Sequence, residues 1–275
     1  MRWWIAALVV GGLGVAGALF IYAPELSFEA KALAMDARPL TEAEELTQRP
    51  LPVPKFRCQQ APCNAFYLQY EVLIDKLGRP TAVILRDAVG EADRDLKTQA
   101  DAYVRSLRYP PLAHPAPVRM WQDLEVFPPV RLPARHVALP VYEPSSVRIT
   151  LERTGCFGSC PAYTVSIDGD GSLLFDGRAY VAEAGKRRGT VDPAAVRALY
   201  EQFRAANFMS LDDSYVTDIT DNPTYTLTLE TAGMRKTVID YGGAKAGMPD
   251  AVTALEDAVD RVAGTSKWIG PPQSW

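Results

Sequence analysis

The apolar pattern begins with one long unbroken run. Residues 3–23 contain no charged side chain, whereas Arg2 precedes the run and Glu25 and Glu29 follow it. About twenty apolar residues in a helix match the thickness of a bilayer's hydrocarbon core. The pattern predicts a transmembrane helix within residues 1–23, and the charge before it places the N-terminus inside and the remaining chain outside.

A cleaved secretory signal is the alternative interpretation of this run. Signals have shorter apolar cores of about 7–15 residues, whereas Leu19 to Tyr22 continue this run past its small residues. We therefore expect a single-pass protein of the bacterial inner membrane with its C-terminal domains in the periplasm. If the run is a signal, the protein is secreted to the periplasm instead.

Shorter periodic segments divide the rest of the chain. Proline at positions 50, 52 and 54 excludes a helix there, and Thr41 and Glu44 fit a capping box that opens a short helix. The predicted organisation is a tether at 24–57, a first domain at 58–130, a linker at 131–145, a second domain at 146–265 and a tail at 266–275.

The first domain shows a strand–strand–helix–strand order. Residues 66–74 alternate apolar and polar side chains, which predicts a strand, and 80–86 are predicted to form the second strand of a hairpin after the turn residues Asp75 to Gly78. Residues 93–107 carry apolar side chains at three-to-four spacing, which predicts a helix. Residues 118–127 form the closing strand. The pattern predicts a small ββαβ unit.

The second domain combines more strands with two helices. The predicted strands are 147–153, 162–167, 172–175, 179–184, 224–229 and 236–241, and Asp168 to Gly171 supply the turn of a hairpin. Helices are expected to start at Pro193, after the cap Asp192, and at Pro249. Lys186 to Arg188 are expected in a turn. The predicted fold class is α+β, and this domain is expected to contain an antiparallel sheet with two helices.

Four cysteines form two close pairs, Cys58 with Cys63 and Cys156 with Cys160. Outside the cytosol an even number of closely spaced cysteines indicates disulfides, and pairing within each neighbouring couple is the simplest connectivity. A zinc site of all four thiolates and a redox-active pair are the alternatives. The three residues between Cys156 and Cys160 depart from the two-residue spacing of redox pairs.

Charge and histidine content narrow the function classes. Lys and Arg total 29 against 33 Asp and Glu without a basic cluster, so we expect no nucleic-acid partner, since binding phosphates requires a concentrated positive surface. The two histidines exclude a multi-histidine metal site. We assign no catalytic residue, metal or cofactor.

An acidic loop at residues 212–221 is the best candidate for chemistry. Its carboxylates bind calcium in one interpretation, form an acid–base pair in another, and cap the turns of a solvated loop in a third. Arg153 forms an anion pocket with nearby glycine amides or ends a strand. The ligand-binding candidates are Asp218, Asp221, Tyr215 and Arg153.

Residues 66–128 resemble the C-terminal domain of TonB, an energy-transducing envelope protein. The likeness lies in Tyr70 to Arg79, in Leu107 to Pro111 and in Met120 to Val126. The resemblance implies an exposed strand edge, near residues 118–127, that accepts a partner's strand. We do not expect proton coupling, because residues 3–23 lack the histidine that such a relay requires.

Residues 147–263 resemble an uncharacterised bacterial family, a domain of unknown function. The likeness lies in Gly155 to Tyr163, which contain Cys-Phe-Gly-x-Cys-Pro-x-Tyr, in the Asp-Gly hairpin and in Tyr215 to Thr224. The resemblance implies a compact α+β module and no particular activity.

These observations together predict a non-enzymatic binding or adaptor protein of the cell envelope. Its expected partners are the membrane, through residues 3–23, and either a protein that adds a strand or an unknown small ligand. A calcium- or ligand-dependent hydrolase-like enzyme centred on residues 212–221 is the alternative.

Overall fold

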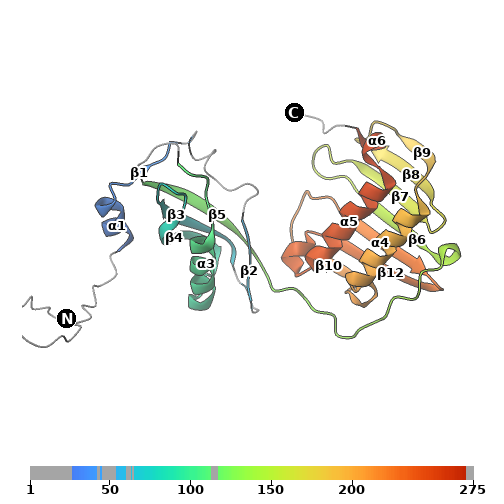
Figure 1. Cartoon of the computed structure of the whole chain (residues 1–275), viewed down its shortest axis with the longest axis horizontal. Helices are drawn as coiled ribbons and strands as arrows, with labels where there is room; N and C mark the ends of the chain where they lie inside the picture. Colours follow the sequence, from blue (N-terminus) through green and yellow to red (C-terminus); the bar gives the residue numbers. More distant parts are fainter. Residues whose placement is uncertain are drawn as a thin grey trace, which may run out of the picture.

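The computed structural model of this 275-residue chain describes residues 27–41, 44, 54–59, 63, 65–112 and 117–270. They form two mixed sheets with about five helices, so the α+β class is confirmed (Figure 1). The transmembrane helix predicted at residues 1–23 lies outside the described residues. Within the described part of the chain, no helix is long and apolar enough to cross a bilayer.

The first sheet contains the predicted ββαβ core. Its strands are β1 (Arg38–Pro39), β2 (Lys55–Arg57), β3 (Ala65–Ile74), β4 (Pro80–Gly90) and β5 (Val118–Phe127), in the order β1-β5-β3-β4 with β2 also pairing β5. Helix α3 (Arg94–Ser106) starts where Asp93 accepts a hydrogen bond from the Leu96 N–H at 2.8 Å. Such an N-cap satisfies a backbone donor that has no partner within the helix.

Part of the predicted tether joins this unit. Helix α1 (Phe28–Ala34) packs Phe28 and Ala32 against Leu73, whereas Val72 and Ile74 belong to the cluster under α3. Since alternate residues of a strand point to opposite faces, α1 and α3 cover opposite faces of the sheet. Strands β1 and β2 lie parallel to β5, which makes the sheet mixed.

The second sheet has seven strands in the order β10-β12-β11-β6-β7-β8-β9. They are β6 (Arg148–Arg153), β7 (Ala162–Asp168), β8 (Ser172–Ala179), β9 (Gly185–Thr190), β10 (Ser214–Val216), β11 (Tyr225–Thr231) and β12 (Met234–Tyr241). The expectation of an antiparallel sheet fails at one edge, because β10 pairs with β12 in parallel.

The strand predicted at 179–184 is wrong. β8 continues to Ala179, and Gly177 pairs with Gly185, so the strand that follows is β9 and contains Lys186 to Arg188. Residues 180–184 connect the two strands. The Ala182 N–H instead donates to the Ile269 carbonyl at 3.0 Å, which ties this connection to the C-terminal end of the domain.

Helices α4 (Pro193–Ala205) and α5 (Asp250–Ala263) lie side by side on one face of the seven-stranded sheet (Figure 1). Both predicted helices are confirmed, and apolar side chains from both are buried in one core cluster. α6 (Ser266–Ile269), within the predicted tail, packs Trp268 on Phe175 with ring centroids 4.9 Å apart. The short 3-10 helices are η1 (Pro144–Ser146), η2 (Phe208–Ser210) and η3 (Gly243–Ala246).

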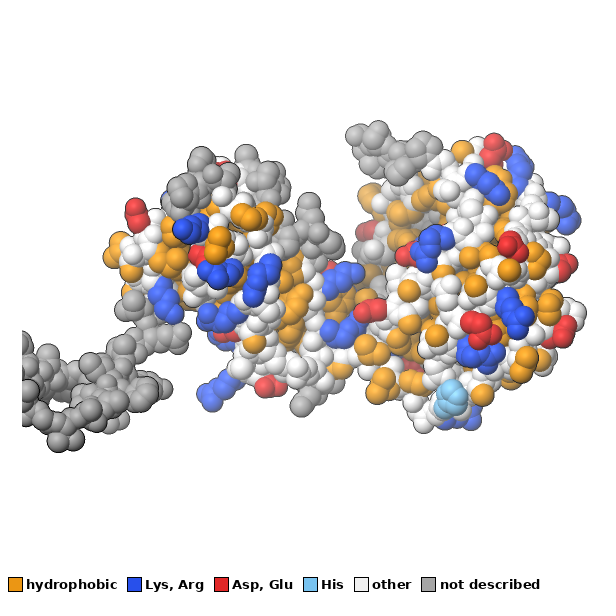
Figure 2. Space-filling view, viewed as in Figure 1, with side chains coloured by type: hydrophobic (Ala, Val, Ile, Leu, Met, Phe, Trp, Pro, Cys, Tyr) orange, Lys and Arg blue, Asp and Glu red, His pale blue; other side chains and the backbone are white. Residues whose placement is uncertain are grey.

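The two units meet between β5 and the η3–α5 region. Lys245 pairs with Glu125 at 3.0 Å, and Arg57 pairs with Asp250 at 2.8 Å. Figure 2 shows basic and acidic side chains gathered where the units meet. A side chain at Gly247 would place Cβ 2.8 Å from the Pro129 carbonyl oxygen, so this close approach requires glycine.

Candidate functional site: a polar row under helix α5

Five polar side chains lie in one row across the second sheet. The pairing register aligns them on five adjacent strands, and directly opposite residues of paired strands point to the same face. Two of the tyrosines are buried in the core beneath the helices, so the row faces α5. In strand order the row is Tyr215, Asp240, Tyr225, Arg153 and Tyr163.

Asp260 of α5 is the hub that fixes one end of the row. One of its oxygens, Oδ1, accepts hydrogen bonds from the Tyr163 hydroxyl at 2.7 Å and the Thr265 hydroxyl at 2.9 Å. The other, Oδ2, accepts from Arg153 Nε at 2.9 Å and lies 2.7 Å from Nη2. A carboxylate has about four lone-pair sites. Three hydrogen bonds and one ion-pair contact therefore fall on the two oxygens of Asp260.

Arg153 is held from a second direction by Tyr225. The guanidinium carbon lies 4.2 Å from the centroid of the Tyr225 ring, and the arginine side chain is 15% exposed. Stacking on an aromatic face sets the plane of the guanidinium, while the Asp260 pair sets its rotation within that plane. Burial, followed by the charge of Asp260, raises the pKa of Tyr163, which keeps that hydroxyl a donor.

A pocket of about 240 Å³ opens beside this cluster. Its lining residues come from β6, β7, β11, α5, α6 and the two loops next to them, and they are Arg153, Cys160, Pro161, Tyr163, Pro223, Tyr225, Asp260 and Ile269. The pocket thus combines one ion pair with proline, tyrosine and isoleucine walls, which is the usual composition of a small-ligand site.

The two loops at the pocket are fixed to each other. The Cys156–Cys160 disulfide closes one loop, and the Phe157 N–H donates to the Asp221 carbonyl of the other at 3.1 Å. The Thr224 N–H also donates to the Thr154 hydroxyl at 2.8 Å. The pocket is therefore largely formed before any ligand arrives, which reduces the entropic cost of binding.

Two further acids of this region are withdrawn from solvent, Glu256 fully and Asp240 in part. Glu256 is 1% exposed, and neither of its carboxyl oxygens has a hydrogen-bond partner within the described residues. Burial, followed by the charge of Asp240, raises the pKa of Glu256 to about 8. The Gly243 N–H donates to the Asp240 carboxylate at 2.7 Å, and burial also raises the pKa of Asp240. Glu256 is therefore mostly protonated at neutral pH, and it does not line the pocket.

Only Arg153 of the four predicted ligand-binding residues lines the pocket. Tyr215 belongs to the row but is buried at its far end, where the Asp212 N–H donates to its hydroxyl at 3.2 Å. The side chains of Asp218 and Asp221 are exposed. Asp221, with φ of 67°, contributes through its backbone carbonyl rather than its carboxylate. The structure therefore does not bring the four predicted ligand-binding residues together in one site.

The acidic loop binds the chain's own basic residues. Asp212 lies 3.4 Å from Arg131 of the linker, whose guanidinium stacks on Tyr215 at 4.7 Å, and Asp213 pairs with Lys236. In the described part of the chain no cluster of three or more His, Cys, Asp or Glu residues suits a metal ion. The loop's contacts match the turn-and-cap interpretation better than a shared ligand site.

Cysteine pairing follows the local pattern, because Cys58 bonds Cys63 and Cys156 bonds Cys160. The two pairs lie in different units of the fold. A zinc site built from all four thiolates therefore does not correspond to this structure.

The strand edge implied by the TonB resemblance is not open along its length. On the side of β5 away from β3, β1 pairs with Val118 and Arg119, and β2 pairs with residues 125–127. The chain itself thus occupies both ends of the edge. This corrects the expectation of an edge exposed throughout residues 118–127.

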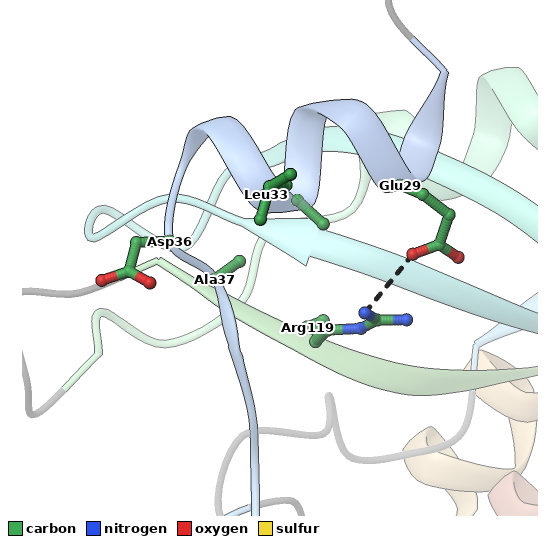
Figure 3. Close-up of a pocket in the computed structure, with 6 residues that line it drawn as sticks. Glu29, Leu33, Asp36, Ala37 and Arg119 are labelled. Atoms are coloured by element: carbon green, nitrogen blue, oxygen red, sulfur yellow. Dashed lines mark ion pairs between the residues drawn. The ribbon is translucent and has the colours of Figure 1, made fainter.

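A second pocket of about 240 Å³ lies where α1 meets β5. Figure 3 shows Glu29 pointing from α1 toward Arg119, 3.4 Å away, while Asp36 points outward. Beneath α1, the mostly buried Glu71 pairs with Arg86 at 2.6 Å and Arg119 at 2.5 Å. These ion pairs hold α1 on the sheet. The lining includes the largely exposed Leu33 and provides few fixed polar groups.

The sequence analysis missed three members of the row and two acids of α5. Glu256 had a readable signal, because it lies four residues after Val252 on the apolar stripe of α5, where a charged side chain is unexpected. Asp260 lies four residues further on the same face. Tyr163, Tyr225 and Asp240 had no such signal, since only the register between strands brings them together.

The fold and the row define this unit as an α+β domain with a preformed polar pocket. Residues 147–263 match the family described as Domain of unknown function (DUF6438), and they form a DUF6438 domain. The resemblance of this half to a domain of unknown function is thereby confirmed. No curated protein matches the chain. Nothing in these comparisons supports a TonB C-terminal domain at residues 66–128.

Proposed function

We propose that this chain is a non-enzymatic binding protein of the bacterial cell envelope, anchored in the inner membrane through residues 3–23 and exposing its DUF6438 domain to the periplasm. The domain binds a small ligand in the Arg153 pocket. One observation carries the proposal. Both oxygens of Asp260 are held by the fold, through three hydrogen bonds and one ion-pair contact, so the charged groups of the pocket are positioned for recognition.

The same observation argues against catalysis in this pocket. A general base must have a lone pair available to accept a proton, and both oxygens of Asp260 already accept hydrogen bonds from the fold. Arg153 does not deprotonate in proteins. Glu256 has a pKa near neutrality, but it is buried and lies outside the lining.

The envelope location is supported by the apolar run and by two local disulfides, which persist in oxidising compartments. A protein partner that adds a strand to β5 is less favoured than a small ligand, because β1 and β2 occupy both ends of that edge.

Cysteine labelling in intact cells tests the location and orientation. Val141 of the linker is 84% exposed, so Val141→Cys offers a thiol that is accessible in the fold. A membrane-impermeant maleimide should label it without lysis, and the chain should sediment with membranes. Labelling only after the inner membrane is opened would contradict the proposal.

A further inference from the structure

The floor of the Arg153 pocket presents an unused edge of a fixed guanidinium. Asp260 binds Nε and Nη2, and the Tyr225 ring fixes the plane, whereas Nη1 has no hydrogen-bond partner within the described residues. Neighbouring N–H groups of a guanidinium match the two oxygens of a carboxylate. The free edge therefore suits a ligand carboxylate.

A charge of opposite sign lies next to this edge. Asp257 is not among the residues that line the pocket, but one of its oxygens is 3.6 Å from Arg153 Nη2 and its side chain is 58% exposed. A ligand with only a carboxylate is repelled by Asp257, whereas a ligand that also carries an ammonium group gains an attraction there. Asp260 is less suited to the ammonium, since both of its oxygens already accept hydrogen bonds.

The walls limit the size and polarity of the rest of the ligand. Pro161, Pro223 and Ile269 offer apolar surface, and the volume of about 240 Å³ is below the usual range of about 300–1,000 Å³ for ligand pockets. A ligand with a short apolar side chain next to its two charged groups fits these apolar walls and this volume.

We propose that the pocket binds a small free amino acid with an apolar side chain, its carboxylate on Arg153 and its ammonium group on Asp257. This inference rests on the proposed binding function and names its ligand class. Asp260 acts as a positioning residue that orients Arg153.

Thermal unfolding of the full chain in detergent micelles tests the ligand class. The probes are alanine, proline and leucine, each as both enantiomers at about 10 mM, together with N-acetylleucine and leucine amide. A ligand that binds only the folded state raises the melting temperature by mass action. At least one free amino acid should raise it, and the N-acetyl and amide analogues should bind at least about tenfold more weakly, which is about 1.4 kcal/mol.

Two variants assign the charges to residues. Arg153→Gln should abolish the shift. Asp257→Asn changes an exposed side chain, so it should fold normally and lose the preference for the free amino acid over its N-acetyl analogue. Arg148→Gln is the control, because Arg148 lies on the same strand but pairs with Asp168, outside the pocket.

Two results would overturn the inference. If N-acetylleucine stabilises the wild type as well as leucine does, the ligand is a simple carboxylate, and the proposed binding function survives. If none of the probes shifts the melting temperature, the amino-acid assignment is wrong. Neither result concerns the membrane anchor, which cysteine labelling tests separately.

Discussion

The two sheets of this protein use buried carboxylate–arginine contacts in different ways. In the first sheet, Glu71 is shared by Arg86 and Arg119, and Glu29 of α1 pairs with both arginines. In the second, Asp260 pairs closely with Arg153 alone and takes its remaining hydrogen bonds from hydroxyl groups. The first arrangement satisfies its arginines with two acids and fastens a helix, whereas the second leaves one edge of an arginine free beside a pocket.

Asp260→Ala should cause the largest loss of stability, and it distinguishes the contacts of Arg153 from those of Glu71. It leaves the largely buried Arg153 without its main counter-charge, and breaking such a pair typically costs about 3–5 kcal/mol. Denaturant unfolding measures the loss. Asp257→Asn, on the same helix but 58% exposed, is the matched control and should change stability by under about 0.5 kcal/mol. A similar loss of stability in both variants would show that Asp260 does not hold Arg153 in place.

Glu256 should make the second unit sensitive to pH. Its folded pKa of about 8 lies above its ordinary value of 4.5, so the folded state holds a proton that the unfolded state releases. Its contribution to stability is complete below pH 4.5 and is lost as the pH rises through 8, at about 1.4 kcal/mol per pH unit between the two pKa values. Glu256→Gln should remove this dependence.

Denaturant unfolding of the wild type and Glu256→Gln at several pH values between 4.5 and 9 measures the difference. The variant should gain relative stability as the pH rises. Parallel pH profiles would mean that Glu256 does not titrate in this range, and the assignment of a protonated buried acid would fail.

Glu71→Gln should have a smaller effect, about 2 kcal/mol, because Glu29 still pairs with Arg86 and Arg119. The loss should appear as faster amide hydrogen exchange in α1, since this short helix buries only Phe28 and Ala32. Arg79→Gln breaks an exposed pair with Asp75 and serves as the control. Unchanged exchange in α1 would show that packing alone holds the helix.

Calcium should produce the smallest effect, namely none. The carboxylates of the 212–221 loop do not share a site: they contact Arg131, contact Lys236 or face solvent. Millimolar calcium should therefore leave the melting temperature of the full chain unchanged. A rise that Asp218→Asn and Asp221→Asn abolish would restore the calcium-dependent alternative.

Local patterns predicted most elements of both sheets. The closing strand Val118–Phe127 and the capped helices α3 and α4 could be read directly, because alternation, three-to-four spacing and cap residues act over short distances. β9 was misplaced, since its polar sequence has no apolar alternation. β10 was missed because three residues of the acidic loop become a strand only by pairing with β12.

The pocket was less accessible from sequence than the fold. Arg153 was selected as an anion binder with neighbouring glycine amides, but its partner is Asp260, 107 residues away. Tyr163 and Tyr225 meet it through strand register, which no local pattern encodes. The acidic residues of the 212–221 loop were selected because they are close in sequence, whereas in the structure their side chains point to different partners or to solvent.

The fixed guanidinium of Arg153 is the central claim, and nitrogen-15 NMR of the arginine-labelled full chain tests it most directly. Because Asp260 accepts a bond from Arg153 Nε at 2.9 Å in a mostly buried position, the Nε–H should exchange slowly and give a resolved signal that Asp260→Asn removes. A signal for Arg153 that exchanges as fast as those of exposed arginines, and does not respond to Asp260→Asn, would contradict the account.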